Sequence, residues 1–297
     1  MKKITFTYFR NCTSLPEISD LVSLGILSKP ISEYTTDDIG SIISIPYNDE
    51  SGKISVNEYG NIEFEIVGIN YYKDINDESK PTITLMTKNV IRLAAYDARE
   101  PNNLDFDRDL YGNNRWSVSN IRQWLNSEGK AGKWFTKQHD YDEAPTVDKV
   151  EGESGAYAAD PGFLTGFSDE IKQHFATVKN KTILCNFDKS ALSKDFEETN
   201  DKVWLPSMTE LGFGNLDSKN PEGNKFIMFK NNSSRIKQFN GTNSTYLIRT
   251  PYRDINFGIQ FVAEDRISWS IFCLCSKRNF NNHYTLLIHN FKFTLYI

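Results

Sequence analysis

The chain has 297 residues, of which 39% are hydrophobic, 25% charged and 13% aromatic, and its formal net charge is -5 at pH 7. This composition is typical of a globular protein that buries a large core. The negative charge argues against sequence-independent nucleic-acid binding, because such proteins displace counterions with clustered Lys and Arg. No apolar run reaches the roughly 18 residues that cross a bilayer, so we also expect no membrane insertion.

The N-terminal region, residues 1–37, carries short segments of mixed character. It begins with Met1-Lys2-Lys3, like the charged region of a signal peptide, but no apolar region follows, so we expect no export by that route. The apolar residues from Ile18 to Leu27 are compatible with one short helix or with a docking hook. We interpret residues 1–37 as an attachment segment and residues 38–297 as one binding domain.

Period-two alternation predicts strands at both ends of this domain, with helices between them. A chain that begins and ends in strands around helices is typical of the α+β class, and we expect its termini to pair in one sheet. The expected strands cover residues 41–45, 62–67, 82–85, 246–249, 258–262, 267–275 and 291–297.

Capping residues predict three helices in the middle of the chain. The first begins at Ser117 or Ser119 and ends near Gly129. The second begins at Ser168, and its spacing places His174 on the polar side. The third follows the capping box Ser207-x-x-Glu210 and ends at Gly212. The residues expected on the buried faces are Val118, Ile121, Trp124 and Leu125 in the first helix, and Ile171, Phe175 and Val178 in the second.

The residues that usually carry catalysis or bind metals show no matching pattern. The cysteines have no metal-ligand spacing, and Cys-x-Cys on a strand lacks disulfide geometry, so we expect reduced thiols and synthesis in a reducing cytoplasm. The histidines show no metal spacing, and no nucleophile elbow or phosphate-binding glycine loop is present. We therefore expect a protein that is not an enzyme, with no catalytic residue, cofactor or metal site. The residues considered are Cys12, Cys185, Cys273, Cys275, His139, His174, His283 and His289.

An alternating acidic loop, Asp105, Asp107 and Asp109, suggests a calcium site. The glycine that calcium loops place at their sixth position is missing, so solvated carboxylates are the preferred interpretation.

The segment with the most specific sequence pattern is residues 114–127, with the sequence Asn-Arg-Trp-Ser-Val-Ser-Asn-Ile-Arg-Gln-Trp-Leu-Asn-Ser. Physically it is a capped amphipathic helix, and its simplest role is a core anchor. It also resembles the Trp-Ser-x-Ser-x-Ile-Arg-x-Trp-Leu-Asn signature of an uncharacterised domain family from Firmicutes, their phages and gut metagenomes. Residues 202–212 and 246–251 resemble two further stretches of that family, in the same order. The likeness spans about residues 39–297 and departs at 290–295, where relatives usually close with a Gly-Val-Arg-Pro-Ala-like strand.

The resemblance implies a C-type-lectin-like fold, an α+β domain with a mixed or antiparallel sheet and two or three helices. Such folds present ligands from loops and short strands on one side, and in related phage and bacterial proteins a retroelement diversifies that surface. Glu100-Pro101-Asn102 copies the calcium- and sugar-binding tripeptide of true C-type lectins. Its position before the Trp116 segment and the lack of a Trp-Asn-Asp partner argue against that role.

The C-terminal region is the candidate binding face. Period two places Ser268, Ser270, Phe272, Leu274 and Ser276 on one face of the expected strand, and residues 278–284 form a loop rich in aromatic and amide side chains, as binding surfaces do. An ordinary sheet strand with a solvated loop is the alternative. The candidate ligand-binding residues are Tyr252, Arg253, Asn256, Ser268, Ser270, Phe272, Leu274, Ser276, Arg278, Phe280, Asn281, Asn282, His283 and Tyr284.

The sequence therefore favours an adhesin of a phage virion, carried on a tail or fibre and made in the host cytoplasm. We expect it to bind a bacterial surface protein or glycan, to contact other virion proteins through residues 1–37, and to form a homo-oligomer that raises avidity. The alternative is a non-catalytic structural or decoration protein of a virion.

Overall fold

The computed structural model describes residues 19–150, 153–184, 196–213, 222–231, 233–244, 246–251, 258–263, 266–271 and 294–296. From residue 258 onward the description covers the backbone alone. The chain is an α+β protein that combines small antiparallel sheets with short helices, so the expected fold class is confirmed.

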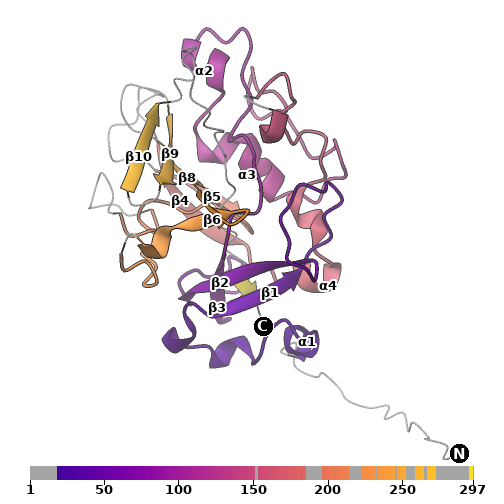
Figure 1. Cartoon of the computed structure of the whole chain (residues 1–297), viewed down its shortest axis with the longest axis vertical. Helices are drawn as coiled ribbons and strands as arrows, with labels where there is room; N and C mark the ends of the chain where they lie inside the picture. The colour runs from indigo at the N-terminus through magenta and orange to yellow at the C-terminus, as the bar shows by residue number, and fades with distance from the viewer. Residues whose placement is uncertain are drawn as a thin grey trace, which may run out of the picture.

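The largest sheet joins the two ends of the described chain. Its order is β1-β2-β3-β11, and every neighbouring pair is antiparallel. The prediction that the first and last strands share a sheet is confirmed, because Leu295 of β11 pairs with Ile83 of β3 (Figure 1). The strands are β1 (Ile42–Pro46), β2 (Asn61–Ile69), β3 (Thr82–Thr87) and β11 (Thr294–Tyr296).

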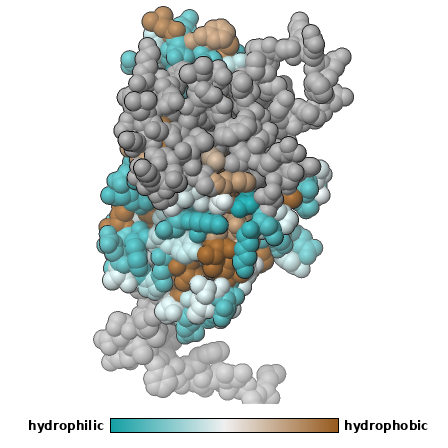
Figure 2. Space-filling model, turned by 90° about the vertical axis from the view of Figure 1, so that its left-hand side faces the viewer, coloured by the Kyte–Doolittle hydropathy of each residue, from teal (hydrophilic) through white to brown (hydrophobic). Residues whose placement is uncertain are grey.

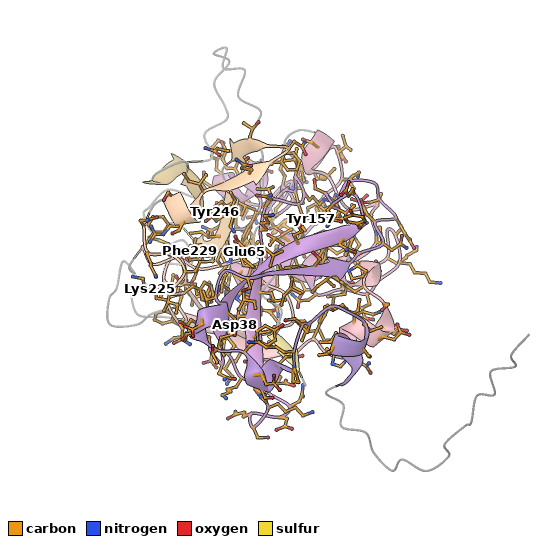
Figure 3. All side chains as sticks on the ribbon, turned by 60° about the horizontal axis from the view of Figure 1, so that its bottom comes forward. Asp38, Glu65, Tyr157, Lys225, Phe229 and Tyr246 are labelled. Atoms are coloured by element: carbon orange, nitrogen blue, oxygen red, sulfur yellow. The ribbon has the colours of Figure 1, made fainter. Side chains whose placement is uncertain are left out.

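The second sheet has the order β10-β9-β8, and two hairpins accompany it. The sequence predicted a strand at each of these three positions. The strand expected over residues 267–275 is β10, which ends at Ile271 in the described residues. Lys237 of the β6–β7 hairpin forms an ion pair with Glu65 of β2 and so links that hairpin to the first sheet (Figure 3 labels Glu65). The strands are β4 (Val178–Ile183), β5 (Phe196–Asp201), β6 (Lys237–Phe239), β7 (Thr242–Ser244), β8 (Tyr246–Pro251), β9 (Gly258–Ala263) and β10 (Arg266–Ile271).

The helices are all short. The α-helices are α1 (Ser19–Ser23), α2 (Phe106–Tyr111), α3 (Asn120–Leu125) and α4 (Asp169–Lys172). The 3-10 turns are η1 (Ile31–Glu33), η2 (Thr36–Asp38), η3 (Trp116–Val118), η4 (Glu153–Gly155), η5 (Phe163–Gly166) and η7 (Ser233–Arg235). None of the helices within the described ranges is both long and apolar enough to cross a membrane.

The first predicted helix is α3, but its bounds differ from the prediction. Ser119 is the N-cap, and its Oγ accepts from the backbone N of Arg122 at 3.4 Å. Val118 belongs to η3 and not to the helix, and α3 ends before Asn126 rather than near Gly129. The reason for the early end is tertiary, because the Asn126 side chain bonds to another loop, as described below.

The second predicted helix is much shorter than expected, which makes one prediction wrong. Because α4 ends at Lys172, His174 no longer follows helical spacing and is only 5% exposed instead of lying on the surface. Phe175 and Val178 are buried as expected, but they lie beyond the helix. The Ser168 side chain makes no capping bond to the helix backbone.

The capping box at residues 207–210 forms around a turn rather than an α-helix. The backbone N of Ser207 donates to Glu210 Oε2 at 2.7 Å, and the backbone N of Glu210 donates to Ser207 Oγ at 3.2 Å. Gly212 ends the turn with a φ of 76°, which glycine adopts without the penalty that a Cβ brings.

One hydrophobic cluster fills the interior and includes residues from the N-terminal region. Leu21, Ile26 and Leu27 are buried in this cluster. Ile31 lies in it as well, together with Trp116 of the signature segment. Residues 21–31 thus contribute to the common core, and the division into residues 1–37 and 38–297 stays a prediction.

Candidate binding site

The predicted binding residues fall mostly outside the described part of the chain. Ser268 and Ser270 lie on β10. The other candidates lie outside the described residues, namely Tyr252, Arg253, Asn256, Phe272, Leu274, Ser276, Arg278, Phe280, Asn281, Asn282, His283 and Tyr284. The same holds for Cys12, Cys185, Cys273, Cys275 and His289.

Strand β10 forms one edge of the second sheet. Ser268 pairs with Phe261, and Phe261 pairs with Leu247 of β8. These two pairs place Ser268 at the same level of the sheet as Leu247, so the register of β10 is fixed relative to β8. Among the described strands, β10 pairs with β9 alone.

Strand β8, at the opposite edge, is anchored through Arg249, which is fully buried. Its Nη1 donates to Glu210 Oε2 at 2.6 Å and to the carbonyl of Leu205 at 2.7 Å. Its Nη2 donates to the carbonyl of Glu222 at 2.7 Å, and its backbone N donates to the carbonyl of Pro206 at 2.8 Å. These bonds join the Leu-Pro-Ser stretch to the Leu-Ile-Arg stretch.

Two buried carboxylates accompany this guanidinium. Tyr72 Oη donates to Glu210, while Glu222 accepts from the backbone N of Ile183 at 3.0 Å and from Thr250 Oγ1 at 2.6 Å. Burial raises the pKa of Glu222, although the charge of Arg249 acts in the opposite direction. The network is a rigid support for β8.

The signature segment around α3 is a second buried anchor. Arg122 Nε donates to Asp201 Oδ1 at 2.7 Å, and Trp116 Nε1 donates to Asp201 Oδ2 at 3.1 Å. Thr199 Oγ1 also donates to this carboxylate, at 2.6 Å. Asp201 lies at the end of β5 and is buried, so the segment is fixed against the β4–β5 hairpin. The core-anchor interpretation accounts for these residues.

Asn126 uses its whole side-chain amide to join α3 to the next loop. Its Oδ1 accepts from the backbone N of Lys202 at 2.8 Å and of Val203 at 3.2 Å. Its Nδ2 donates to the carbonyls of Arg122 at 3.0 Å and Val203 at 2.8 Å. This bridge explains why the helix ends where it does.

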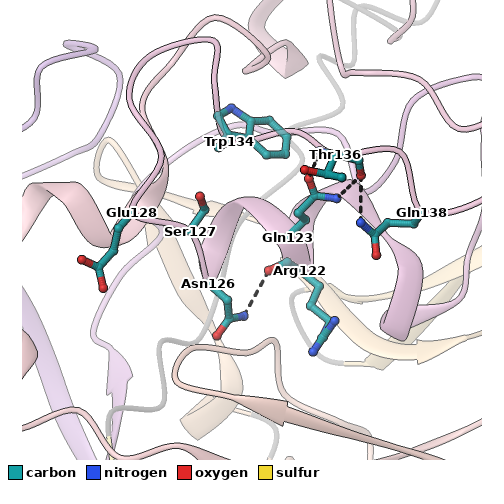
Figure 4. A pocket seen from close by; sticks show the side chains of 8 residues that line it. All are labelled: Arg122, Gln123, Asn126, Ser127, Glu128, Trp134, Thr136 and Gln138. Carbon is teal, nitrogen blue, oxygen red and sulfur yellow. Dashed lines mark hydrogen bonds between the residues drawn. The ribbon is translucent and has the colours of Figure 1, made fainter.

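A polar hollow of about 490 Å³ lies beside α3 (Figure 4). Its lining is largely occupied in internal bonds, since both Gln123 and Gln138 donate to the carbonyl of Thr136 at 2.8 Å. Glu128 is held by Lys172 at 3.0 Å. Its lining residues are Arg122, Gln123, Asn126, Ser127, Glu128, Trp134, Thr136 and Gln138.

Within the described part of the chain, one group of side chains has ligand atoms close enough to hold a metal ion: one such atom from each of Asp97, Glu100 and His139 lies within 4.8 Å of the other two. The donor set does not fit a metal, because Arg108 already donates to Glu100 Oε1 at 3.1 and 2.9 Å. Arg108 Nη2 also lies 3.3 Å from His139 Nδ1, where a metal-bound imidazole would carry its proton. Burial raises the pKa of Asp97. The group acts as an internal hydrogen-bond network.

Sequence reasoning did not identify Asp97, His139 or Asp201 as members of these networks. Each is a single residue without a motif, and most of its partners lie far away in the chain. The stretches around Glu210 and Arg249 carried a signal, because both resemble family stretches, but nothing in the sequence paired them.

The chain belongs to the family described as Domain of unknown function (DUF6273), which matches residues 81–278 and thus more than half of the chain. Comparisons with curated proteins and with solved structures found no match.

Proposed function

We propose that the chain is a receptor-binding protein of a phage virion, carried on a tail or fibre, with a C-type-lectin-like domain. Its target is a protein or glycan on a bacterial surface, and the binding face is formed by β10 and the residues around it. The observation that carries the proposal is the contrast between the two edges of the second sheet: β8 is buried and pinned through Arg249, whereas β10 has β9 as its described partner.

A strand held in place by buried bonds, in the same sheet as an edge strand with one described neighbour, suits recognition for a physical reason. Binding costs less free energy when the contacting groups are already held in place, and the Arg249 network fixes the strand from which β9 and β10 extend. Loops and edges on a rigid scaffold also tolerate sequence changes that a core would not. A face of this kind is compatible with diversification by a retroelement.

The resemblance of residues 114–127, 202–212 and 246–251 to a family of Firmicutes and phages supports the virion setting. In that setting the N-terminal segment contacts other virion proteins, and a homo-oligomer multiplies weak contacts to the receptor.

The test is binding of the labelled, purified chain to intact cells of a panel of Firmicutes strains. Ser268→Glu with Ser270→Glu places two charges on β10, and we expect at least tenfold weaker binding to any strain that the unchanged chain binds. The matched control is Ser41→Glu with Ser55→Glu, at two exposed serines away from β10. Equal binding by the β10 variant, or binding to none of the strains, would contradict the proposal.

Truncation separates this proposal from a structural or decoration role. The deletion should remove residues 1–18 only, because Leu21 and Leu27 are part of the core. An adhesin without these residues still binds cells, whereas a decoration protein binds none and loses only its incorporation into virions.

A further inference from the structure

Two large apolar side chains are exposed where the chain enters α2, one in the preceding loop and one at the first residue of the helix. Leu104 is 97% exposed and Phe106 is 73% exposed. Removing apolar side chains of this size from water is favourable, so the exposure of both leaves that stabilisation unused in the isolated chain. In Figure 1, α2 lies at the end of the molecule opposite α1, and Figure 2 shows a brown, hydrophobic area at that end. We call Leu104 and Phe106 the apolar tip.

The loop that carries the apolar tip is held by its own side chains. Asn103 Oδ1 accepts from the backbone N of Asp105 at 2.9 Å, and Asp105 Oδ1 accepts from the backbone N of Asp107 at 3.0 Å as the N-cap of α2. Asp109 Oδ1 accepts from the backbone N of Asn102 at 2.7 Å. The tip is therefore displayed by a preorganised loop, which lowers the entropy cost of a contact.

The base of the loop is fixed to the body of the protein. Arg108 donates twice to the buried Glu100, and the backbone N of Glu100 donates to the carbonyl of Arg108 at 3.0 Å. Gly112 ends α2 with a φ of 79° and packs so closely on Ala98 that a Cβ would lie 2.1 Å from its carbonyl oxygen.

The charged residues of α2 and its N-cap are mainly acidic. Asp105, Asp107 and Asp109 alternate with the apolar residues, and the one cation of α2, Arg108, is paired with Glu100. Carboxylates next to an apolar contact favour a partner whose apolar pocket is bordered by Lys or Arg.

We propose that the apolar tip docks into a cationic protein surface, with Leu104 and Phe106 filling an apolar pocket and the aspartates facing Lys or Arg at its rim. Leu104 and Phe106 lie at the start of α2 and not on β10, so the inference goes beyond the proposed function. The three carboxylates disfavour nucleic acid and anionic membranes, which both repel them. A second copy of this chain, with a net charge of -5, is disfavoured for the same reason.

The energetics follow those of known interfaces, in which a few buried apolar or aromatic residues carry most of the affinity and the charged rim sets the rate and the partner. The apolar side chains should therefore control affinity, and the aspartates should control salt dependence.

The probe is a displayed library of random peptides, selected on the immobilised full chain. We expect the selected peptides to combine Lys or Arg with aromatic or aliphatic residues. Their affinity for the chain should fall at least tenfold in the double variant Leu104→Ser with Phe106→Ser. The matched control is Tyr59→Ser, which removes an aromatic side chain 77% exposed elsewhere and leaves the affinity unchanged. Thermal melting checks that each variant is folded.

The charge is tested with Asp107→Asn, which keeps the Asp105 cap in place. We expect weaker binding of the selected peptides and a smaller loss of affinity when salt is added. Selected peptides without Lys or Arg, binding that ignores the apolar tip, or no selected peptide at all would overturn the proposal.

Discussion

Arg249 and Glu210 form a fully buried ion pair, with Nη1 2.6 Å from Oε2, between residues 39 positions apart in the chain. The pair joins β8 to the turn that the capping box forms. Since the described sheet depends on β8, this contact supports the whole proposed binding face.

Arg249→Met is expected to destabilise the protein strongly, because it leaves Glu210 buried without its cation. Removing one partner of a buried pair costs about 3–5 kcal/mol. Adding Glu210→Gln should recover part of that loss, and a double-mutant cycle by urea unfolding measures the coupling. Independent, additive effects of the two changes would show that the pair does not act as a unit.

Asn126→Asp is expected to destabilise the protein although the two side chains have nearly the same shape. Asparagine donates to the carbonyls of Arg122 and Val203, whereas a carboxylate repels both. We expect a loss of about 2–4 kcal/mol in the free energy of unfolding, in line with buried groups left unsatisfied. Asn57→Asp is the control, because Asn57 Oδ1 accepts from the backbone N of Tyr59 and of Asn61, and a carboxylate oxygen can accept the same bonds. An equally small loss at Asn126 would contradict the bridge.

Glu222→Gln is expected to remove part of the pH dependence of stability. Burial raises the pKa of Glu222 in the folded state, so the folded protein holds a proton that the unfolded chain has released. The stabilisation is complete below the unfolded pKa and is lost as the pH rises through the folded pKa. Urea unfolding between pH 4 and pH 8 (approximately the range of these titrations) should show a smaller decline for Glu222→Gln. Parallel curves for the two proteins would contradict this assignment.

Gly112→Ala is expected to destabilise the α2 loop more than Gly132→Ala does. Both glycines have positive φ, so both substitutions carry a backbone cost. The cost is about 1–2 kcal/mol in the left-handed region and is higher at Gly112, whose ψ of -158° puts it in a region that is essentially restricted to glycine. Only at Gly112 does a Cβ also collide with the Ala98 carbonyl, whereas nothing lies within 4 Å of it at Gly132. Thermal melting of both variants measures the difference, and equal shifts would show that the Ala98 contact relaxes freely.

The strands could be predicted because the alternation of apolar and polar residues indicates which side chains face the core. In β1, Ile43 and Ile45 are buried while Ile42 is exposed, as the period-two pattern implies. The shared sheet of the two ends followed from the order of strands and helices. The position of His174 could not be predicted, because helical spacing applies only while the helix continues, and α4 ends at Lys172.

The networks that support the candidate site could not be predicted for a different reason. Local patterns identified Ser207, Glu210 and Arg249 separately, but a buried ion pair between distant segments leaves no periodic signal. The exposure of Leu104 and Phe106 could not be predicted either. A sequence shows that a side chain is apolar, but it does not show whether other residues cover it.

The central claim, that the chain binds a bacterial surface through β10, is tested most directly by hydrogen exchange on the chain bound to cell envelopes and free in solution. The account predicts that binding slows exchange in residues 258–271 and leaves residues 42–69 unchanged. Slower exchange confined to residues 42–69, or no difference between bound and free chain, would contradict it.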